Sequence, residues 1–347
     1  MSESNESVEK FEDAKERFND AMRIASMDRI TREVADLDTS VEKMPSEIEE
    51  VRDRGYAFRS YLERKAEVFA KNWEDIKRRV TSAVDTEVEE LRQDVDEAEK
   101  QVQQAERYAE LPAKLERIIA QVEGAVERLE NRVEGAAERI QAMYETLKRD
   151  VDSTYSQLRQ VKWFMDMKDE ASFEFMQGES VFLVAEAEWV ATGKGKEDPD
   201  GMLFLTDQRL VFEQKEKTGK RFGMFGGKMT QEVELDIPLH HVENVEAENK
   251  GMFGGKDMLH FTMKDGPHSK ITIEVKGSAD NKFWVKQINR MAAGEADDER
   301  AIEPDAEMVE RLREAPTECH VCGATLPILM AGQTQIACEY CGAVIRL

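Results

Sequence analysis

The chain is poor in the residues that mark secreted, membrane-spanning or catalytic proteins. Only 7% of its 347 residues are aromatic, and it has four cysteines, eight prolines and five histidines. No apolar run approaches the roughly 18 residues that span a bilayer, and the polar residues 1–7 do not look like a signal peptide. None of the histidines lies in an acid–base or nucleophile motif. We therefore expect neither an enzyme nor an integral membrane protein.

A surplus of basic charge is also missing. The chain carries 49 basic and 73 acidic side chains, a net charge of −24. Residues 1–169 hold 29 basic and 41 acidic groups, residues 170–293 hold 16 and 21, and residues 294–347 hold 4 and 11. Because every region is acidic, its long-range field repels nucleic acid and anionic lipid. Nucleic acid is not an expected partner.

Residues 1–168 are predicted to form a helical coiled-coil arm. Pro45 and Pro112 are expected to start helices, which gives helices over 5–42, 46–110 and 112–168. After Pro112, apolar residues fill the a and d positions of four heptads, and a four-residue stutter follows Leu147. The a/d residues are Ile119, Val122, Val126, Leu129, Val133, Ala136, Ile140, Met143 and Leu147. The arm is expected to form a homo-oligomer or to fold back as an antiparallel pair.

An aromatic stretch within this arm allows a second interpretation. Aromatic side chains suit membrane interfaces, so the stretch is typical of a membrane-surface helix, although acidic residues lie between the rings. The aromatic residues are Tyr56, Phe58, Tyr61, Phe69 and Trp73. Recognition of a partner helix is a third interpretation of the arm.

Residues 170–293 have the pattern of a β-rich domain. Met202 to Leu205 and Leu210 to Phe212 flank the turn-forming residues 206–208, which predicts a tight hairpin whose Asp207 bonds the local backbone. Seven short strands are followed by an amphipathic helix with Ser278 as its cap. We expect a small β-barrel or two packed sheets, with the helix covering one open end.

The segments 201–212 and 237–245 resemble the pleckstrin-homology-like (PH-like) superfamily, closest to its GRAM and bacterial PH-like branches. They read Gly-Met-Leu-Phe-Leu-Thr-Asp-Gln-Arg-Leu-Val-Phe and Ile-Pro-Leu-His-His-Val-Glu-Asn-Val. This resemblance covers about a third of the chain and implies a seven-stranded domain with a Trp-bearing C-terminal helix. It also implies that the domain binds phosphoinositides, peptides or other proteins.

The motif Gly-Met-Phe-Gly-Gly-Lys occurs twice, at 223–228 and 251–256. Both copies are expected in hairpin loops at the same end of the β domain. They are either plain glycine-rich turns or a paired rim that docks lipid head groups or protein through two phenylalanine tips and basic neighbours. The candidate docking residues are Phe225, Lys228, Phe253, Lys256, Lys220 and Arg221.

All four cysteines fall in two Cys-x-x-Cys-Gly pairs, Cys319 with Cys322 and Cys338 with Cys341. Paired thiolates at this spacing can converge on tetrahedral Zn²⁺, and so short a segment cannot fold on apolar burial alone. The pattern predicts a zinc ribbon with one structural zinc ion in a reducing, cytoplasmic compartment. Redox chemistry at the pairs and ligation by His320 are the alternatives.

These expectations together describe a multidomain α + β protein. Residues 1–168 form the coiled-coil arm, 170–293 the PH/GRAM-like domain, 294–316 an acidic linker with a short helix, and 317–347 the zinc ribbon. The first functional hypothesis is a non-enzymatic scaffold or adaptor that docks protein partners. The second is an organiser, peripheral to a membrane, that binds lipid head groups through the PH-like loops.

Overall fold

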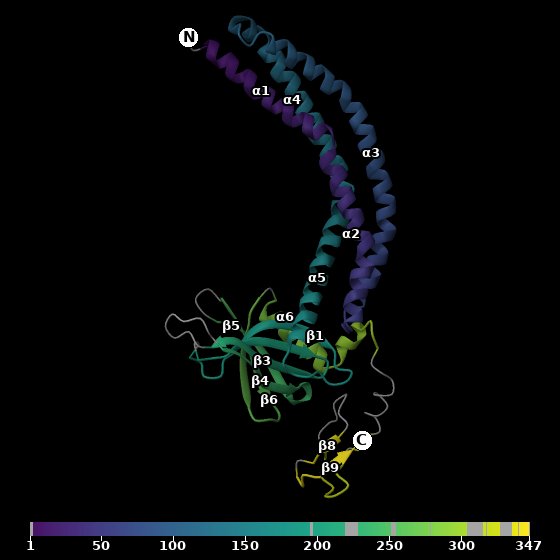
Figure 1. Cartoon of the computed structure of the whole chain (residues 1–347), viewed down its shortest axis with the longest axis vertical. Helices are drawn as coiled ribbons and strands as arrows, with labels where there is room; N and C mark the ends of the chain where they lie inside the picture. The colour runs from purple at the N-terminus through teal and green to yellow at the C-terminus, as the bar shows by residue number, and fades with distance from the viewer. Residues whose placement is uncertain are drawn as a thin grey trace. The chain divides into compact units, whose positions relative to one another are not determined.

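A computed structural model describes residues 3–194, 197–218, 228–250, 255–277, 279–303, 315–316, 318–326, 335–338 and 340–346. The chain divides into two compact units. The helical unit comprises Met1–Glu47 and Leu62–Gln157, and the sheet unit comprises Ile48–Tyr61 and Leu158–Leu347. A helical region is thus followed by a region built on an antiparallel sheet, as expected (Figure 1).

Five long helices precede the sheet. They are α1 (Glu3–Ala25), α2 (Asp28–Asp53), α3 (Tyr61–Glu106), α4 (Pro112–Ala142) and α5 (Glu145–Glu170). In the described part of the chain, none of them combines the length and apolar content needed to cross a membrane.

In the helical unit, α1 and α2 run parallel to α4 and α5. Arg17 donates to Glu130 over a sequence separation of 113 residues, and the Tyr155 hydroxyl donates to the Ser40 carbonyl over 115. When the contacting residues keep nearly the same separation in sequence along two helices, the helices run parallel and in register. The backbones of α1 and α4 lie side by side along much of their length (Figure 1).

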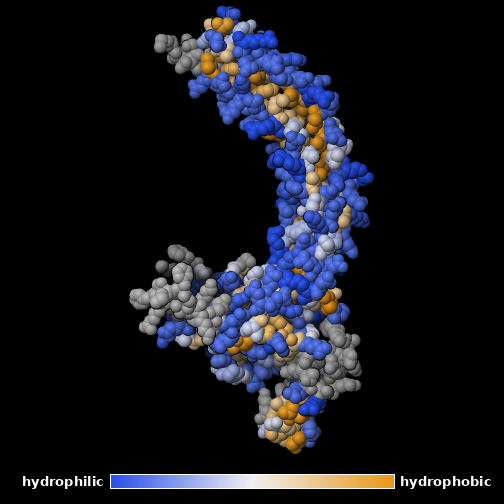
Figure 2. Space-filling model, in the orientation of Figure 1, coloured by the Kyte–Doolittle hydropathy of each residue, from blue (hydrophilic) through white to orange (hydrophobic). Residues whose placement is uncertain are grey.

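Helix α3 runs antiparallel to α2 and to α4. Trp73 Nε1 donates to Asp38 Oδ1 of α2 at 2.8 Å, and Arg139 of α4 donates to Glu87 at 2.7 Å. The helical unit therefore contains three helical segments side by side, namely α1 with α2, α3, and α4 with α5. The sequence predicted only an antiparallel pair of helices. On the face shown in Figure 2, hydrophilic residues cover the outside of the helices, and hydrophobic residues run in a strip between them.

The predicted heptad seam is the interior of this unit. Its a/d residues from Ile119 to Leu147 are buried, except Met143, which is 43% exposed. Met143 is exposed because α4 ends at Ala142 and the chain tightens there, with Tyr144 N donating to the Gln141 carbonyl. The helix break thus lies before Leu147, where the sequence predicted only a stutter after it.

Two predicted helix boundaries are wrong. Pro45 lies inside α2, which instead begins at Asp28 after Met27 takes a left-handed φ of 54°. The expected helix over 46–110 is interrupted between Asp53 and Tyr61. Gly55 has a φ of 90° there, and the Arg52 guanidinium donates to the Tyr56 carbonyl at 2.7 Å, which satisfies backbone left without helical partners. Pro112 does begin α4, as predicted.

The membrane-surface interpretation of the aromatic stretch is also wrong. Tyr56 and Phe58 are buried in the sheet unit, and Phe69 and Trp73 are buried in the helical unit. Phe58 meets Phe182 edge to face, with ring centroids 4.9 Å apart. Tyr56 and Phe58 lie in the loop before α3, which turns them inward, whereas Phe69 and Trp73 lie on the buried face of α3.

The sheet has seven antiparallel strands in the order β4-β3-β2-β1-β7-β6-β5. They are β1 (Val181–Trp189), β2 (Asp200–Thr206), β3 (Arg209–Thr218), β4 (Lys228–Pro238), β5 (Val242–Lys250), β6 (Lys256–Met263) and β7 (Lys270–Val275). The 3-10 turn η1 (Leu239–His241) joins β4 to β5. Among the described residues β4 and β5 do not pair, so the sheet is open and the expected closed barrel is not found.

Helix α6 (Asn281–Ala292) and the 3-10 turn η3 (Glu295–Glu299) follow the sheet. The N-cap is Asp280, whose side chain accepts the Phe283 N–H at 2.7 Å. Ser278, the cap predicted from the sequence, lies outside the described residues. The buried face of α6 includes Trp284 and Ile288, in agreement with the amphipathic pattern.

The predicted hairpin is β2 and β3, with Leu205 opposite Leu210. Its turn is held by the Thr206 hydroxyl, which accepts the N–H groups of Gln208 and Arg209 at 3.1 and 3.0 Å. Asp207 does not make the local bond expected of it. Its carboxylate accepts the Ser180 N–H at 3.0 Å and pairs with Arg300, and burial raises its pKa.

A buried ion pair lies directly beneath this hairpin. Arg209 Nε and Nη2 donate to the two carboxylate oxygens of Glu179 at 2.8 and 2.9 Å. The Thr206 hydroxyl donates to the same carboxylate at 2.8 Å, and Asp236 accepts from Arg209 Nη1 at 2.6 Å. The Thr-x-x-Arg spacing of the hairpin therefore places a hydroxyl and a guanidinium on one buried carboxylate.

Gly201 permits the close approach of β2 to β3. A Cβ at this position would lie 1.9 Å from the Glu213 carbonyl oxygen, a distance that no side chain tolerates. The first residue of the resemblance segment is thus glycine for a steric reason.

Candidate metal centre and docking surfaces

The two Cys-x-x-Cys pairs form matching backbone turns in the described part of residues 318–346, which we name the cysteine module. The Gly323 N–H donates to the Cys319 carbonyl at 2.7 Å, and the Gly342 N–H donates to the Cys338 carbonyl at 2.8 Å. The two glycines have φ values of 72° and 71°, a left-handed conformation that explains the glycine after each pair. Each turn presents its two sulfur atoms on one side.

The turns bring all four sulfur atoms together. Cys319 Sγ lies 3.7 Å from Cys341 Sγ, and Cys322 Sγ lies 3.6 Å from Cys338 Sγ. All four Sγ atoms fall within 4.8 Å of one another. Tetrahedral zinc with Zn–S bonds of about 2.3 Å requires sulfur–sulfur separations of about 3.8 Å. The four thiols therefore fit a tetrahedral metal ion, although the geometry alone does not select zinc.

Backbone amides point at these sulfur atoms. The amide N–H groups of Cys341 and Tyr340 lower the pKa of the Cys338 thiol to about 7. The Ala324 amide lowers the pKa of Cys322, but hydrogen bonds to the other thiols and burial outweigh it and raise that pKa to about 12. The backbone amides and the neighbouring thiols thus shift the pKa values of Cys338 and Cys322 in opposite directions.

Little else holds this module together in its described residues. The antiparallel strands β8 (Gln335–Ala337) and β9 (Val344–Arg346) form its sheet. Its buried core consists of Cys319, Leu326, Ile336, Cys338 and Ile345. Two of these five core residues, Cys319 and Cys338, are also candidate metal ligands. His320 is exposed and does not belong to the cluster.

Two apolar side chains project from the turns at equivalent positions. Val321 and Tyr340 each precede the second cysteine of their pair, and they are 61% and 80% exposed. Val344 on β9 is exposed as well. Sequence reasoning missed these side chains because they are not candidate ligands, although their matched position between the cysteines is visible in the sequence.

The repeated Gly-Met-Phe-Gly-Gly-Lys motif belongs to the β3–β4 and β5–β6 hairpins. Thr218 pairs with Lys228, and Lys250 pairs with Lys256. The strand registers place the β3–β4 hairpin end at the same end of the sheet as the β1–β2 connection. The β5–β6 hairpin end lies at the opposite end, because β1 pairs antiparallel with β7 and β6 therefore runs parallel to β1. The prediction that both copies share one end is wrong.

Most candidate docking residues of the motif lie outside the part of the chain that the structure describes. They are Phe225, Phe253, Lys220 and Arg221, together with the side chain of Lys228. Lys256 pairs with the carboxylate of Glu274 on β7, and this hydrogen bond raises its pKa. One basic group of the predicted rim is therefore paired with a carboxylate of the sheet.

No family model matches this chain, and no curated protein matches it. Solved structures similar to it include the N-terminal PH domain of Vps36, at 14% identity over 35% of this chain and 84% of that chain, with a TM-score of 0.25. A PH domain from Shewanella amazonensis SB2B shows 21% identity over 37% of this chain and 97% of that chain, with a TM-score of 0.25.

A third similar structure contains the DH and PH domains of PDZ-RhoGEF in complex with GTP-γ-S-activated RhoA. It shows 13% identity over 83% of this chain and 94% of that chain, with a TM-score of 0.25. PH domains are named in all three of these structures. TM-scores this low carry no argument about function, so the function of this chain has to be inferred from its own residues.

Proposed function

We propose that the chain is a non-enzymatic adaptor whose cysteine module holds one structural zinc ion and docks a protein partner. Cys319, Cys322, Cys338 and Cys341 would hold the ion. Bound zinc would cross-link the two turns and supply the folding free energy that the small core lacks. A cytoplasmic location agrees with this proposal, because thiolate ligands need a reducing compartment.

The observation that carries the docking proposal is the exposed pair Val321 and Tyr340. Tyrosine is enriched at protein interfaces, where it offers a large apolar face and a polar tip. Two such side chains at matched positions on metal-held turns form a rigid surface that loses little conformational entropy on binding. The shortage of basic residues in this region favours a protein partner over nucleic acid.

The partner can be identified and then tested with purified proteins. A photo-crosslinking amino acid at position 340 would mark the protein in contact with the module. We expect Val321→Ser with Tyr340→Ser to weaken binding of the purified partner by roughly tenfold or more, because apolar anchors at an interface contribute about 1–3 kcal/mol each. Calorimetric titration measures the loss.

The matched control is His320→Ala, which changes an exposed residue of the same turn without touching a candidate ligand. Metal content should be unchanged in both variants. Equal affinity of the parent and the double variant, at equal metal content, would exclude this surface as the docking site.

Assembly through the helical unit remains a separate prediction. The a/d seam expected to join chains is buried within the chain itself. A homo-oligomer would therefore have to form through outward-facing residues, such as the exposed Met22 and Val68.

The second candidate function is a membrane-associated organiser, favoured by the motif that recurs in two hairpins of the sheet. Two phenylalanine tips would each contribute about 1.5–3 kcal/mol of apolar burial, and nearby lysines about 1 kcal/mol each at an anionic surface. Because the chain carries a net charge of −24, such binding should be weak and should weaken further with added salt.

Liposome flotation tests this alternative. We expect Phe225→Ala with Phe253→Ala to abolish flotation with anionic vesicles and to leave the melting temperature nearly unchanged. A double variant that melts well below the parent would show that the two rings are core residues. A parent protein that fails to float in low salt would remove the membrane hypothesis altogether.

A further inference from the structure

Two of the three segments of the helical unit are broken at nearly the same level along its length. Helix α1 ends at Ala25 and α4 ends at Ala142, and the next helix begins three residues later in each case. Nη2 of Arg29, the second residue of α2, lies 3.5 Å from Oε1 of Gln141, the residue before the last of α4. The two breaks therefore lie within about one helical turn of each other.

Both breaks are tight turns of the backbone. Met27, between α1 and α2, has a φ of 54°, a left-handed conformation that residues other than glycine rarely adopt. Its N–H donates to the Ile24 carbonyl at 2.9 Å, and the Met143 N–H donates to the Ile140 carbonyl at 3.0 Å. Each of these bonds reaches back three residues instead of the four of an α-helix, so the helical hydrogen-bond ladder is interrupted in both segments.

Helix α3 runs past both breaks without interruption (Figure 1). The bond from Arg139 of α4 to Glu87 identifies the part of α3 that lies at this level. None of residues 81–90, all of which the structure describes, is buried, whereas Val80 and Leu91 on either side are buried. This is the longest stretch of α3 without a buried side chain. The one continuous segment is therefore loosely packed where the other two are broken.

The same stretch of α3 has the weakest helical composition of that helix. All its serine and threonine residues lie there, and they are Thr81, Ser82 and Thr86. The Thr86 hydroxyl donates to the Ser82 carbonyl at 2.9 Å, four residues back. Bonds of this kind slightly destabilise a helix and favour its bending. Threonine also loses rotamer freedom in a helix.

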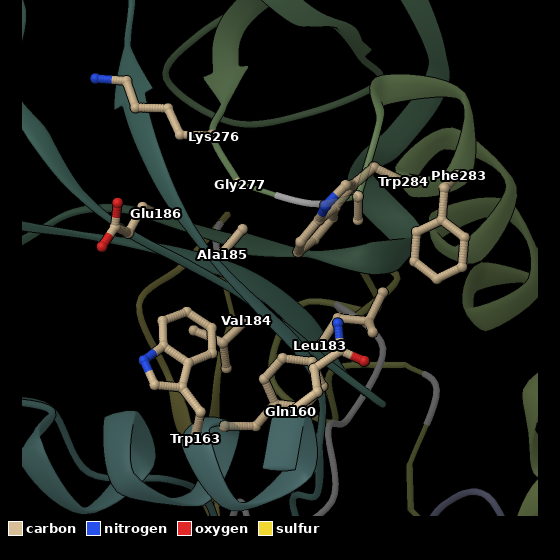
Figure 3. A pocket seen from close by; sticks show the side chains of 12 residues that line it. Gln160, Trp163, Leu183, Val184, Ala185, Glu186, Lys276, Gly277, Phe283 and Trp284 are labelled. Carbon is tan, nitrogen blue, oxygen red and sulfur yellow. The ribbon is translucent and has the colours of Figure 1, made fainter. Parts of the chain in front are cut away.

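A cavity of about 330 Å³ lies at the α1–α2 break, and its lining includes Ile24, Met27 and Ala137 of α4. Because close packing resists bending, a void at this level leaves room for the segments to move. The sheet unit also has a cavity, of about 300 Å³, whose lining includes Trp163 of α5 and Trp284 of α6 (Figure 3). Both of those helices are unbroken there, so of the two cavities only the one in the helical unit coincides with helix breaks.

We propose that this level is a hinge, about which two parts of the helical unit change their angle. One part contains α1, α4 and the end of α3, and the other contains α2, the start of α3 and the start of α5. Residues 81–90 of α3 absorb the change by bending. A partner that contacts both parts would select one angle from the populated range. The hinge requires neither the cysteine module nor its metal, so either proposal can fail without the other.

Distances between two spin labels in the full chain test the hinge. Labels attached to a ketone-bearing amino acid leave the four cysteines untouched. One pair, at Asn72 and Asp96, spans the hinge along α3, and the control pair, at Lys114 and Glu138, lies within the unbroken α4. All four residues are exposed, and both pairs are the same number of residues apart, about 36 Å along a helix. We expect the hinge pair to give a distance distribution roughly twice as wide as that of the control pair, because bending adds to the motion of the labels.

The combined variant Thr81→Ala, Ser82→Ala and Thr86→Ala should stiffen α3, because it removes the hydroxyl-to-carbonyl bond and raises helix propensity. All three residues are exposed, so the chain should fold as the parent does. We expect the distribution of the hinge pair to narrow by roughly a third. The matched control is Thr39→Ala with Ser40→Ala, which removes two such bonds, of 3.0 and 2.9 Å, from α2 away from the breaks. It should leave the distribution unchanged.

Three results would overturn the proposal. A hinge pair with a distribution no wider than that of the α4 pair would show that the helical unit is rigid at this level. An unchanged distribution in the combined variant would show that residues 81–90 do not bend. Equal narrowing in the combined variant and in its control would assign the motion to the helices as a whole.

Discussion

Replacing Cys338 with serine is expected to remove the bound zinc and to unfold the cysteine module, while the seven-stranded sheet stays folded. Cys338 is both a candidate ligand and one of the five buried core residues of the module. A structural zinc ion contributes about 10–16 kcal/mol of apparent binding free energy at neutral pH, far more than so small a core can replace. Elemental analysis gives the metal content, and amide resonances report which part unfolds.

The control for this experiment is His320→Ala, which should keep one zinc ion per chain. Freshly purified, reduced protein that contains no zinc would contradict the prediction at its first step. A Cys338→Ser variant with the metal content and spectrum of the parent would contradict it at the second.

Replacing Arg209 with leucine is expected to destabilise the sheet unit by about 3–5 kcal/mol, the usual consequence of removing one partner of a buried ion pair. The Glu179 side chain is 0% exposed and would lose its bidentate partner. The free energy of unfolding from denaturant titration measures the effect. The matched control is Lys215→Ala, which breaks the outer ion pair with Glu170 and should change stability by less than about 1 kcal/mol.

A double variant separates the ion pair from simple packing. Leucine at both 179 and 209 leaves no unpaired charge, so it should be more stable than Arg209→Leu alone. If the single variant loses less than the Lys215 control, the buried pair does not stabilise the fold. If the double variant is the less stable of the two, packing around the guanidinium matters more than its charge.

Local pattern was sufficient to locate several features of this chain. Two apolar runs on either side of the turn-forming residues 206–208 predicted the β2–β3 hairpin, because short apolar runs bounded by turn residues are typical of paired strands. The repeated motif was assigned correctly to the β3–β4 and β5–β6 hairpins, but its placement at one end of the sheet was wrong. That placement assumed a simple up-and-down order, whereas β1 pairs with β7 and the last three strands run the other way. The spacing of the cysteines predicted a cluster that the structure contains.

The wrong predictions concern helix boundaries and the burial of aromatic rings, which depend on contacts between segments far apart in the sequence. Pro45 is tolerated inside α2, where its neighbours Met44 and Ile48 are buried in a continuous apolar face. The aromatic rings at 56 and 58 entered a core because of a loop that begins at Gly55, which no periodicity reports.

The sequence by itself determined the type of each element and the residues that can ligate a metal, because helix period, strand period and thiol spacing are local properties of the chain. Only the tertiary structure decided what each apolar or polar face meets. It buried the heptad seam within the helical unit, paired Arg209 with Glu179 from 30 residues away, and left the buried Trp284 indole N–H without an acceptor among the described residues. These contacts depend on packing between segments far apart in the sequence. No periodic pattern in the sequence indicates which distant residue a given side chain will contact.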